Sequence, residues 1–375
     1  MATERLYYTD CYLKQFDAQT LSVSEGGLRV VLDRSAFYPS SGGQLFDVGE
    51  LGGARVIEVV DEGDFVAHVL ASPLAAGPVH GAIDWVRRFE FMQQHTGQHL
   101  LSAVFHEWFG LETASVHLGE DGGTVELTVN SLDERQVVEA EIRANSLIAE
   151  NRAVSISFEE NPEGLRKAPE RTGALRIVSI EGLDRSACGG THVRRTGEIG
   201  SLLVRKAEKI RGNTRLEFVC GLNAVRRARM DFDLLSAAGR AFSRPLEEIP
   251  TAVAALQEAA KDSSKLAKNL SLELAGYRGR SLFSEALTGA DGARRHWEKL
   301  ATVDETARAV AQAFVGCGKA VFLATGGGAV LVAASADAGV HCGNVLKQFG
   351  RGGGSAGLAQ GSLAETGLLA EALGF

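Results

Sequence analysis

Two short segments carry the side chains best suited to binding a metal ion. His95 and His99 stand four residues apart in His-Thr-Gly-Gln-His, and Cys188 and His192 stand four apart in Cys-Gly-Gly-Thr-His. On a helix, a spacing of four leaves two side chains about 40° apart around the axis, one turn from each other. The two glycines allow a bend that brings Cys188 and His192 together. Paired nitrogen and sulfur donors suit tetrahedral Zn²⁺, so we predict one shared metal site.

Each segment alone has a plainer interpretation. A histidine pair at this spacing also occurs on ordinary helix surfaces, and the second segment could be a turn around a buried thiol. The five cysteines are widely scattered, which favours reduced thiols or metal ligation over disulfides. The prediction of a metal site therefore depends on the two segments meeting in the fold.

The composition indicates a folded protein with more than one domain. The chain has 375 residues, of which 45% are hydrophobic and 23% charged. A formal net charge of −8 argues against indiscriminate binding of nucleic acid. No apolar run is long enough to cross a bilayer and the first residues do not resemble a signal peptide, so we expect no membrane partner and a cytoplasmic location.

The elements that must position these side chains change in type along the chain. Short β-branched runs punctuated by glycines predict a small β-barrel before residue 87, and helical periodicity from there places His95 and His99 on a helix. A second helix is predicted at 133–151. Further strands are predicted at 154–158, 175–180, 200–206 and 215–219.

A long helix is predicted after Gly221, because leucine and other apolar residues recur at helical spacing to about residue 275. Such an apolar stripe could join two copies of the chain or pack back on the tail. The tail should contain strands at 320–325 and 329–334, and a glycine-rich loop at 350–355 before the last helix. The tyrosines and tryptophans are scattered, and we interpret them as core or rim residues.

The two metal-binding segments, with LDRSAFYPSSGGQ at 32–44, resemble the editing domain of alanyl-tRNA synthetase and its free-standing relatives, the AlaX proteins. The tail FGRGGGSAGLAQG at 349–361 resembles the C-terminal glycine-rich module of these synthetases, called DHHA1. All four signals stand in the order of the long form, AlaX-L. The resemblance therefore covers nearly the whole chain.

The resemblance and the periodicities together imply an α+β multidomain fold. We expect an N-terminal β-barrel at 1–86, an α+β zinc-containing editing core at 87–221, a helical, coiled-coil-like connector at 222–278 and an α/β DHHA1-like domain at 279–375. A homodimer could form through the connector or the C-terminal domain.

The resemblance also implies a zinc-dependent hydrolase of mischarged tRNA(Ala), acting chiefly on its seryl ester, with the glycyl ester as a second candidate substrate. Its zinc ligands map to His95, His99, Cys188 and His192, of which the first two are also expected to serve in catalysis. Four protein ligands close a zinc shell as in structural sites, so zinc could activate water, lose a ligand or only orient substrate. No carboxylate stands beside the motif in the sequence as an obvious general base. We therefore expect the zinc ion to have a positioning and electrostatic role.

Two residues upstream are further candidates for catalysis. The family usually has threonine where this chain has Ser35, and the hydroxyl there is expected to recognise the hydroxyl of a mischarged serine. The alternative is that Ser35 only caps a turn. Gln44 should line the substrate pocket, or else serve a plain hairpin.

Basic residues gather late in the editing core. They include Arg194, Arg195, Arg205 and Lys206, and they indicate either a face that follows RNA phosphates or a solvated surface. In the tail, Arg351 with Gly352, Gly353 and Gly354 could approach an RNA backbone closely or form a structural loop.

Two rival functions fit parts of the sequence. A non-catalytic tRNA-binding module with a structural zinc would explain a closed four-ligand shell, but it would not need the 35–44 stretch. A phosphodiesterase of the DHH type shares DHHA1-like tails, yet it needs an Asp-His-His tripeptide, which this sequence lacks.

Overall fold

The computed structural model describes residues 2–168, 173–363 and 367–375. The chain forms two compact units, Met1–Ala237 and Ala238–Phe375, and each of them mixes helices and strands. The expected α+β multidomain class is confirmed, while the finer division into four domains stays a prediction. Among the described helices, none has the length and apolarity needed to cross a membrane.

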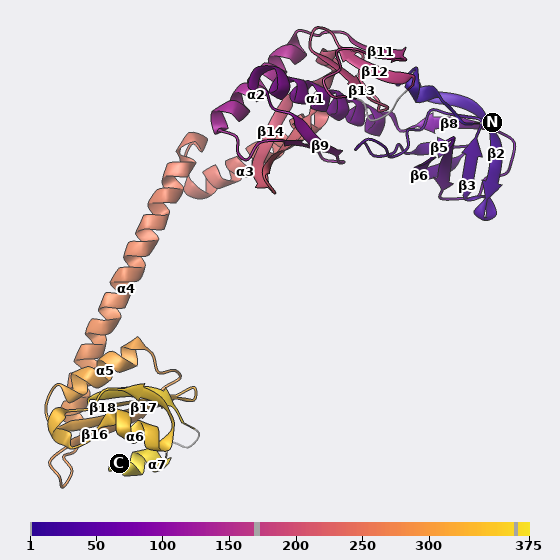
Figure 1. The fold of residues 1–375 in the computed structure, drawn as a ribbon. Helices are drawn as coiled ribbons and strands as arrows, with labels where there is room; N and C mark the ends of the chain where they lie inside the picture. Colours follow the sequence, from indigo (N-terminus) through magenta and orange to yellow (C-terminus); the bar gives the residue numbers. More distant parts are fainter. Residues whose placement is uncertain (1, 169–172, 364–366) are drawn as a thin grey trace. The chain divides into compact units, whose positions relative to one another are not determined.

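The first unit begins with a closed six-stranded barrel in the order β2-β3-β7-β6-β5-β8, as expected for the N-terminal region (Figure 1). Its strands are β2 (Gln15–Ser24), β3 (Arg29–Leu32), β5 (Gly49–Leu51), β6 (Ala54–Glu62), β7 (Phe65–Leu70) and β8 (Pro78–Ile83). Alternate side chains such as Val30, Leu32 and Val56 fill its interior. A short parallel pair, β1 (Glu4–Arg5) with β4 (Arg34–Ser35), lies outside the closed barrel.

The helix α1 (Trp85–Phe109) runs through the centre of the rest of the first unit. Asp84 caps its start by accepting a hydrogen bond from the backbone N–H of Arg87, and Gly110 ends it in the left-handed conformation. Every residue from Phe91 to Phe105 is buried. A helix that is buried all round serves as a core element, and it fixes the side chains it carries.

Two sheets and a second helix enclose α1. One sheet has the order β14-β15-β10-β9, and the other has the order β11-β12-β13. The elements are β9 (Thr113–Leu118), β10 (Gly123–Leu127), α2 (Glu134–Ala149), β11 (Val154–Glu159), β12 (Leu175–Ile180), β13 (Asp184–Ala187), β14 (Leu202–Ile210) and β15 (Asn213–Cys220). A capping box between Asp133 and Gln136 starts α2, close to where the sequence predicts it.

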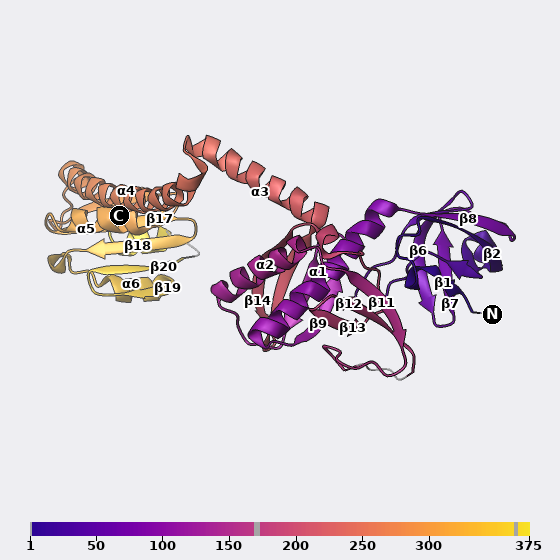
Figure 2. The ribbon, with the colours of Figure 1, turned by 90° about the horizontal axis from the view of Figure 1, so that it is seen from above.

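The second unit is a five-stranded sheet with helices on both faces. Its order is β16-β17-β18-β20-β19, in which only β16 and β17 are parallel. The elements are α4 (Ile249–Glu285), β16 (Arg294–Lys299), α5 (Glu305–Val315), β17 (Ala320–Gly326), β18 (Ala329–Ala334), α6 (Cys342–Phe349), β19 (Arg351–Gly354), β20 (Leu358–Ser362) and α7 (Gly367–Ala372). Figure 2 shows α4 and α5 on one face and α6 on the other, and two separate apolar clusters fill these layers.

The single long helix expected after Gly221 is two helices, α3 (Gly221–Phe242) and α4. Ser243 has φ +51°, in the left-handed region, and Pro245 follows it. A left-handed residue ends a helix, and proline two residues later cannot continue the ladder of hydrogen bonds. The expected stripe on α4 is present, with Leu256, Leu270 and their neighbours exposed to solvent rather than packed on the tail.

The expected glycine-rich loop at 350–355 is for the most part a strand. Residues Arg351–Gly354 form β19, which pairs antiparallel with β20 at the edge of the sheet. A side chain at Gly352 would lie 2.5 Å from the carbonyl oxygen of Gln360, so glycine permits a close approach of the two strands. The sequence indicated glycines that allow close approach of a backbone but not the strand that they form.

Candidate metal centre

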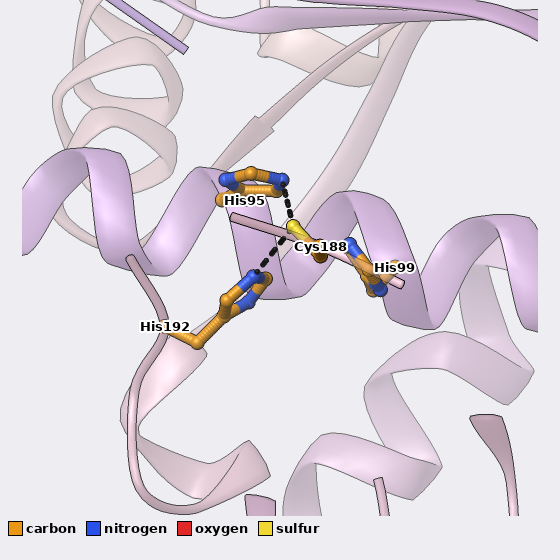
Figure 3. A group of neighbouring side chains, drawn as sticks. All are labelled: His95, His99, Cys188 and His192. Carbon is orange, nitrogen blue, oxygen red and sulfur yellow. Dashed lines mark hydrogen bonds between the residues drawn. The ribbon is translucent and has the colours of Figure 1, made fainter. Parts of the chain in front are cut away.

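The two predicted segments meet in the first unit and form a group that could hold a metal ion. His95 and His99 project from α1, while Cys188 and His192 lie on the loop that follows β13 (Figure 3). One ligand atom from each of the four residues lies within 4.8 Å of the others. The convergence expected from the sequence is confirmed.

A hydrogen bond from outside the cluster orients each imidazole through its Nδ1 atom. His95 Nδ1 donates to Gln44 Oε1 at 2.8 Å, and His99 Nδ1 lies 3.0 Å from a carboxylate oxygen of Asp184. His192 Nδ1 lies 3.2 Å from Thr96 Oγ1. Since the Thr96 hydroxyl donates its own proton to the carbonyl of Met92, its oxygen accepts from His192.

These bonds leave Nε2 of the histidines free to face the thiol. Cys188 Sγ lies 3.4 Å from Nε2 of His95 and 3.3 Å from Nε2 of His192, as the dashed lines in Figure 3 mark. The backbone N–H of Gly190 also points at the sulfur, at 3.3 Å. Donors held by outer partners in this way are typical of metal-binding histidines.

The electrostatics of the cluster favour a thiolate at Cys188 and a neutral imidazole at His192. Burial alone would raise the pKa of Cys188, but His95 and His192 lower it well below its ordinary value. Burial, together with the charge of His95, lowers the pKa of His192 to about 3. Thiolate sulfur and neutral imidazole nitrogen are the forms that coordinate zinc.

His99 differs because it faces a carboxylate. Burial disfavours its protonated form, yet the hydrogen bond with Asp184 and the nearby Cys188 raise its pKa to about 9. Burial would raise the pKa of Asp184, but His99 and Arg166 lower it to about 2. A carboxylate–histidine pair of this kind makes the imidazole a stronger ligand once a metal displaces the proton.

The residues present fit a zinc ion. They supply three nitrogens and one sulfur, a donor set of tetrahedral Zn²⁺ sites, and their outer partners hold them in place. The three histidines are buried, while Cys188 is partly exposed and Gly189 is exposed. The exposed part of the metal-binding loop is therefore at Cys188 and Gly189.

Gln44 takes part in a hairpin and contacts the cluster as well. Its backbone exchanges hydrogen bonds with Ser41 across a tight turn, which is the hairpin role considered in the sequence. Its side chain is buried and bonds His95, and it also accepts from the backbone N–H of Thr191 and donates to the Thr191 hydroxyl at 2.8 Å. One amide thus connects both metal-binding segments.

A buried ion pair holds the segment that carries Gln44. Arg88 on α1 and Asp47 are both fully buried, with the Nε atom of Arg88 3.0 Å from the carboxylate. Arg88 also donates to the carbonyls of Cys11 and Ala36, and Asp47 accepts from the backbone N–H of Tyr38. The pair therefore ties the 36–47 stretch to the helix of the metal centre.

The Ser35 hydroxyl is fully buried and caps a turn, which was the plainer interpretation of this residue. It accepts a hydrogen bond from the backbone N–H of Phe37 and lies 2.8 Å from His68 Nε2. His68 Nδ1 donates to the carbonyl of Val30, so Nε2 accepts the proton of Ser35. Burial lowers the pKa of His68 to about 4, which keeps this ring neutral.

The predicted basic residues are exposed, and carboxylates lie near several of them. Arg194 contacts Asp10 at 3.3 Å, Arg205 contacts Asp231 at 2.7 Å, and Lys206 contacts a neighbouring glutamate. Arg195 donates to a backbone carbonyl instead. In the second unit, Arg351 and the three glycines after it are exposed along β19.

Sequence reasoning missed the outer partners of the metal centre. Asp184 stands four residues before Cys188, and Thr96 lies inside the histidine segment, so only their contacts reveal their roles. The sequence gives no obvious carboxylate as general base beside the motif, and the structure adds Asp184 as a hydrogen-bond partner of His99. Cys11 and Cys220 are buried thiols, as the sequence indicated.

The region that carries β12 to β15 matches a known domain model. Residues 175–217 match the second additional domain of threonyl- and alanyl-tRNA synthetases, which includes Cys188 and His192. The fold and site thus define a chain that contains a domain also found in these synthetases.

The chain belongs to the AlaX family of alanyl-tRNA editing proteins. It is 37% identical over 241 residues to alanyl-tRNA editing protein AlaX-M of Methanosarcina mazei, an alignment that covers 58% of this chain and 96% of that protein. It is 34% identical over 305 residues to the alanine–tRNA ligase of Ignicoccus hospitalis, covering 77% of this chain and 33% of the ligase. The ligase of Pyrobaculum aerophilum is 32% identical over 96% of this chain, which spans 42% of its length.

Proposed function

We propose that the chain is a trans-editing hydrolase that removes serine from mischarged Ser-tRNA(Ala), with Zn²⁺ at the cluster of His95, His99, Cys188 and His192. The proposal is carried by one observation: four donor atoms lie within 4.8 Å of one another, and Cys188, which supplies one of them, is partly exposed. The names of the AlaX-M relatives give the class of substrate. Gly-tRNA(Ala) is a second candidate substrate.

An aminoacyl ester is already activated, so the protein needs only to position a water molecule and the ester and to stabilise the negative charge that develops. When bound, zinc would supply a Lewis acid that orients the substrate and stabilises negative charge. Gln44, through His95, and Asp184, through His99, hold the two imidazoles that we assign to catalysis. We assign Asp184 to positioning rather than to proton abstraction, since its pKa of about 2 makes it a weak base.

We propose that the remaining lone pair of the Ser35 hydroxyl accepts a hydrogen bond from the hydroxyl of a seryl group. The Ser35 hydroxyl donates its proton to His68 and accepts a hydrogen bond from the backbone N–H of Phe37. Only one lone pair of its oxygen remains, so the substrate must act as the donor. An alanyl group lacks that donor and would leave the buried Ser35 acceptor unpaired, which disfavours binding of the alanyl ester.

We assign tRNA contacts to Arg194, Arg195, Arg205 and Lys206, and to β19 with Arg351, Gly352, Gly353 and Gly354. All of these residues are exposed, and exposed ion pairs are weak enough for phosphates to compete with. We also propose that the second unit is the DHHA1-like domain of a long-form AlaX protein in the cytoplasm. The exposed apolar stripe of α4 supports a homodimer through the connector.

The alternative is a tRNA-binding module with a structural zinc. Four protein ligands around one ion favour it, because structural sites are closed in this way. Partial exposure of Cys188 and Gly189 speaks against it, since a structural site has no need of an open side.

The test is hydrolysis of purified Ser-tRNA(Ala), Gly-tRNA(Ala) and Ala-tRNA(Ala), with and without a zinc chelator. We expect selective loss of the seryl ester, abolished by chelation and by Cys188→Ala or His95→Ala. Circular dichroism of each sample checks that zinc removal has not unfolded the protein. Binding of tRNA with no hydrolysis by the folded, zinc-loaded protein would establish the alternative.

A further inference from the structure

Two aromatic rings, each with a cation over it, lie beside the loop of the metal centre. The guanidinium carbon of Arg194 lies 4.0 Å from the centre of the Tyr12 ring, and Lys14 Nζ lies 4.4 Å from the centre of the Trp85 ring. The two rings contact each other with their centroids 5.5 Å apart. We call these four residues, Lys14, Trp85, Tyr12 and Arg194, the ring–cation strip.

The strip is accessible, and its parts are fixed. Lys14 and Arg194 are exposed, whereas Tyr12 and Trp85 are half-buried and pack against the core. The Tyr12 hydroxyl donates to Glu198 at 2.6 Å and accepts from the backbone N–H of Arg194 at 3.0 Å. The Arg194 side chain, 64% exposed, therefore presents its guanidinium group to solvent above an anchored ring.

The strip lies close to the metal centre. Arg194 stands two residues after the ligand His192. Arg176 donates both to the carbonyl of Tyr8 at 3.0 Å and to the carbonyl of Cys188 at 2.6 Å, so the segment before Tyr12 runs beside the metal-binding loop. The metal-binding loop and the segment that leads to the strip therefore lie side by side.

The charges of the strip favour an anionic ligand. Lys14 has no ion pair with any residue in the described ranges 2–168, 173–363 and 367–375, and the exposed Arg195 lies next to Arg194. Two acids oppose them: Asp10, at 3.3 Å from Arg194, and Glu198, which accepts the hydrogen bond of the Tyr12 hydroxyl. Because the Asp10 contact is exposed, a phosphate can compete for the guanidinium group.

We propose that the ring–cation strip binds the unpaired 3′ end of an RNA substrate, with one base stacked on the guanidinium of Arg194 and a phosphate at Lys14. Proteins bind single strands through cations that follow the backbone and planar groups on which bases stack. This inference rests on the proposed function, because an aminoacyl ester on tRNA is carried by such an end. An acidic peptide would meet the cations but would not need the planar group.

The test compares two fluorescent RNA hairpins that differ only in an unpaired 3′ extension. We expect the full-length protein to bind the extended hairpin on the order of ten-fold more tightly than the blunt one. Arg194→Ala and Lys14→Ala should remove most of this preference. Arg194→Lys keeps the positive charge but loses the planar guanidinium group, so this variant should also show a reduced preference for the extended hairpin.

Arg143→Ala is the matched control, because Arg143 lies 5.3 Å from the centre of the Trp108 ring, in a similar pair at the other end of α1. Its RNA preference should equal that of the wild type. The inference is overturned if the wild type binds both hairpins equally, if Arg194→Ala keeps the preference, or if Arg194→Lys restores it fully. If the protein hydrolyses Ser-tRNA(Ala) but does not prefer the extended hairpin, the role of the strip is rejected and the proposed function stands. If it prefers the extended hairpin but does not hydrolyse Ser-tRNA(Ala), the proposed function is rejected and the RNA binding of the strip stands.

Discussion

At the scale of single residues, Gln44 determines how the metal centre is held together. Its amide oxygen accepts from His95 and from the backbone of Thr191, and its amide nitrogen donates to the Thr191 hydroxyl. The side chain thus fixes the ring of one ligand and the loop that carries two others. Replacing it removes no ligand, so the effect should appear in metal affinity before it appears in folding.

We predict that Gln44→Leu lowers the affinity for zinc by about 10- to 100-fold, the range found when an outer partner of a metal ligand is lost. The His95 ring would lose the acceptor that fixes its orientation. Competition with a chromophoric chelator measures the affinity directly, without reference to hydrolysis.

Gln98→Leu provides the control, since Gln98 is buried on the same helix next to His99 and donates to the Ser102 hydroxyl rather than to a residue of the metal-binding loop. Its affinity for zinc should match the wild type. Equal affinities of the Gln44 and Gln98 variants would show that Gln44 does not hold the ligand.

His68 should make the first unit sensitive to acid. Burial lowers the pKa of His68 from 6.5 to about 4, so between these values the unfolded chain binds a proton that the folded chain excludes. The contribution of neutral His68 to the free energy of unfolding is therefore fully present above pH 6.5 and is lost as the pH falls towards 4. We predict a free energy of unfolding lower by on the order of 2 kcal/mol at pH 5 than at pH 7.5 from this group.

The measurement is denaturant unfolding of the wild type and of His68→Gln at both pH values. Loss of zinc and titration of other groups affect both proteins, so the difference between them isolates His68. If both proteins lose the same stability on acidification, His68 is not the responsible group.

At the scale of elements, periodicity and glycine placement predicted most of what holds the site. The spacing of His95 and His99 predicted one helix face, and the two segments meet as expected. The remaining determinants depend on the tertiary fold. No local pattern indicates that Asp184 reaches His99, and the residue Ser243 that ends α3 has no strong preference for the left-handed conformation it adopts.

Tertiary packing also explains why glycine stands at position 97, within the helix of the metal centre. A Cβ atom at Gly97 would lie 2.4 Å from the sulfur of Cys220, so α1 packs against the end of β15 at this residue. The sequence shows the glycine but not the strand beneath it. The buried Cys220 thiol, whose pKa is raised by burial, is therefore a packing group.

The two glycines of the metal-binding loop should differ sharply in tolerance. A Cβ at Gly190 would lie 2.1 Å from Cε1 of His95, whereas at Gly189 the nearest atom is the Tyr8 hydroxyl at 3.6 Å, an ordinary contact. We predict that Gly190→Ala lowers the zinc affinity at least ten-fold by displacing the His95 ring. Gly189→Ala should bind zinc like the wild type.

Metal analysis after dialysis against a weak chelator reports both variants, with circular dichroism to check their folding. The pair is matched in chemistry, since each change adds one methyl group to the same loop. A wild-type zinc content in Gly190→Ala would mean that the loop moves without disturbing the ligands.

At the scale of the whole molecule, two compact units divide the chain within α3. The first two turns of α3 belong to the first unit by their contacts. Ala224 is buried, Asn223 donates to the carbonyl of Glu120, and Arg226 pairs with Glu90. The alignment with the AlaX-M protein of Methanosarcina mazei covers 96% of that relative but 58% of this chain, so a relative lacks a large part of what this chain contains.

We predict that residues 1–243 fold alone and bind one equivalent of zinc, because all four candidate ligands and their outer partners lie in the first unit. A cut after residue 220 should yield a less stable protein, since it removes the buried Ala224 and the contacts of Asn223 and Arg226. Thermal unfolding and metal analysis of the two fragments and the full chain provide the comparison. If residues 1–243 were unfolded, or folded without zinc, the second unit would be required for the metal centre. Equal stability of the two fragments would show that α3 adds nothing to the unit it follows.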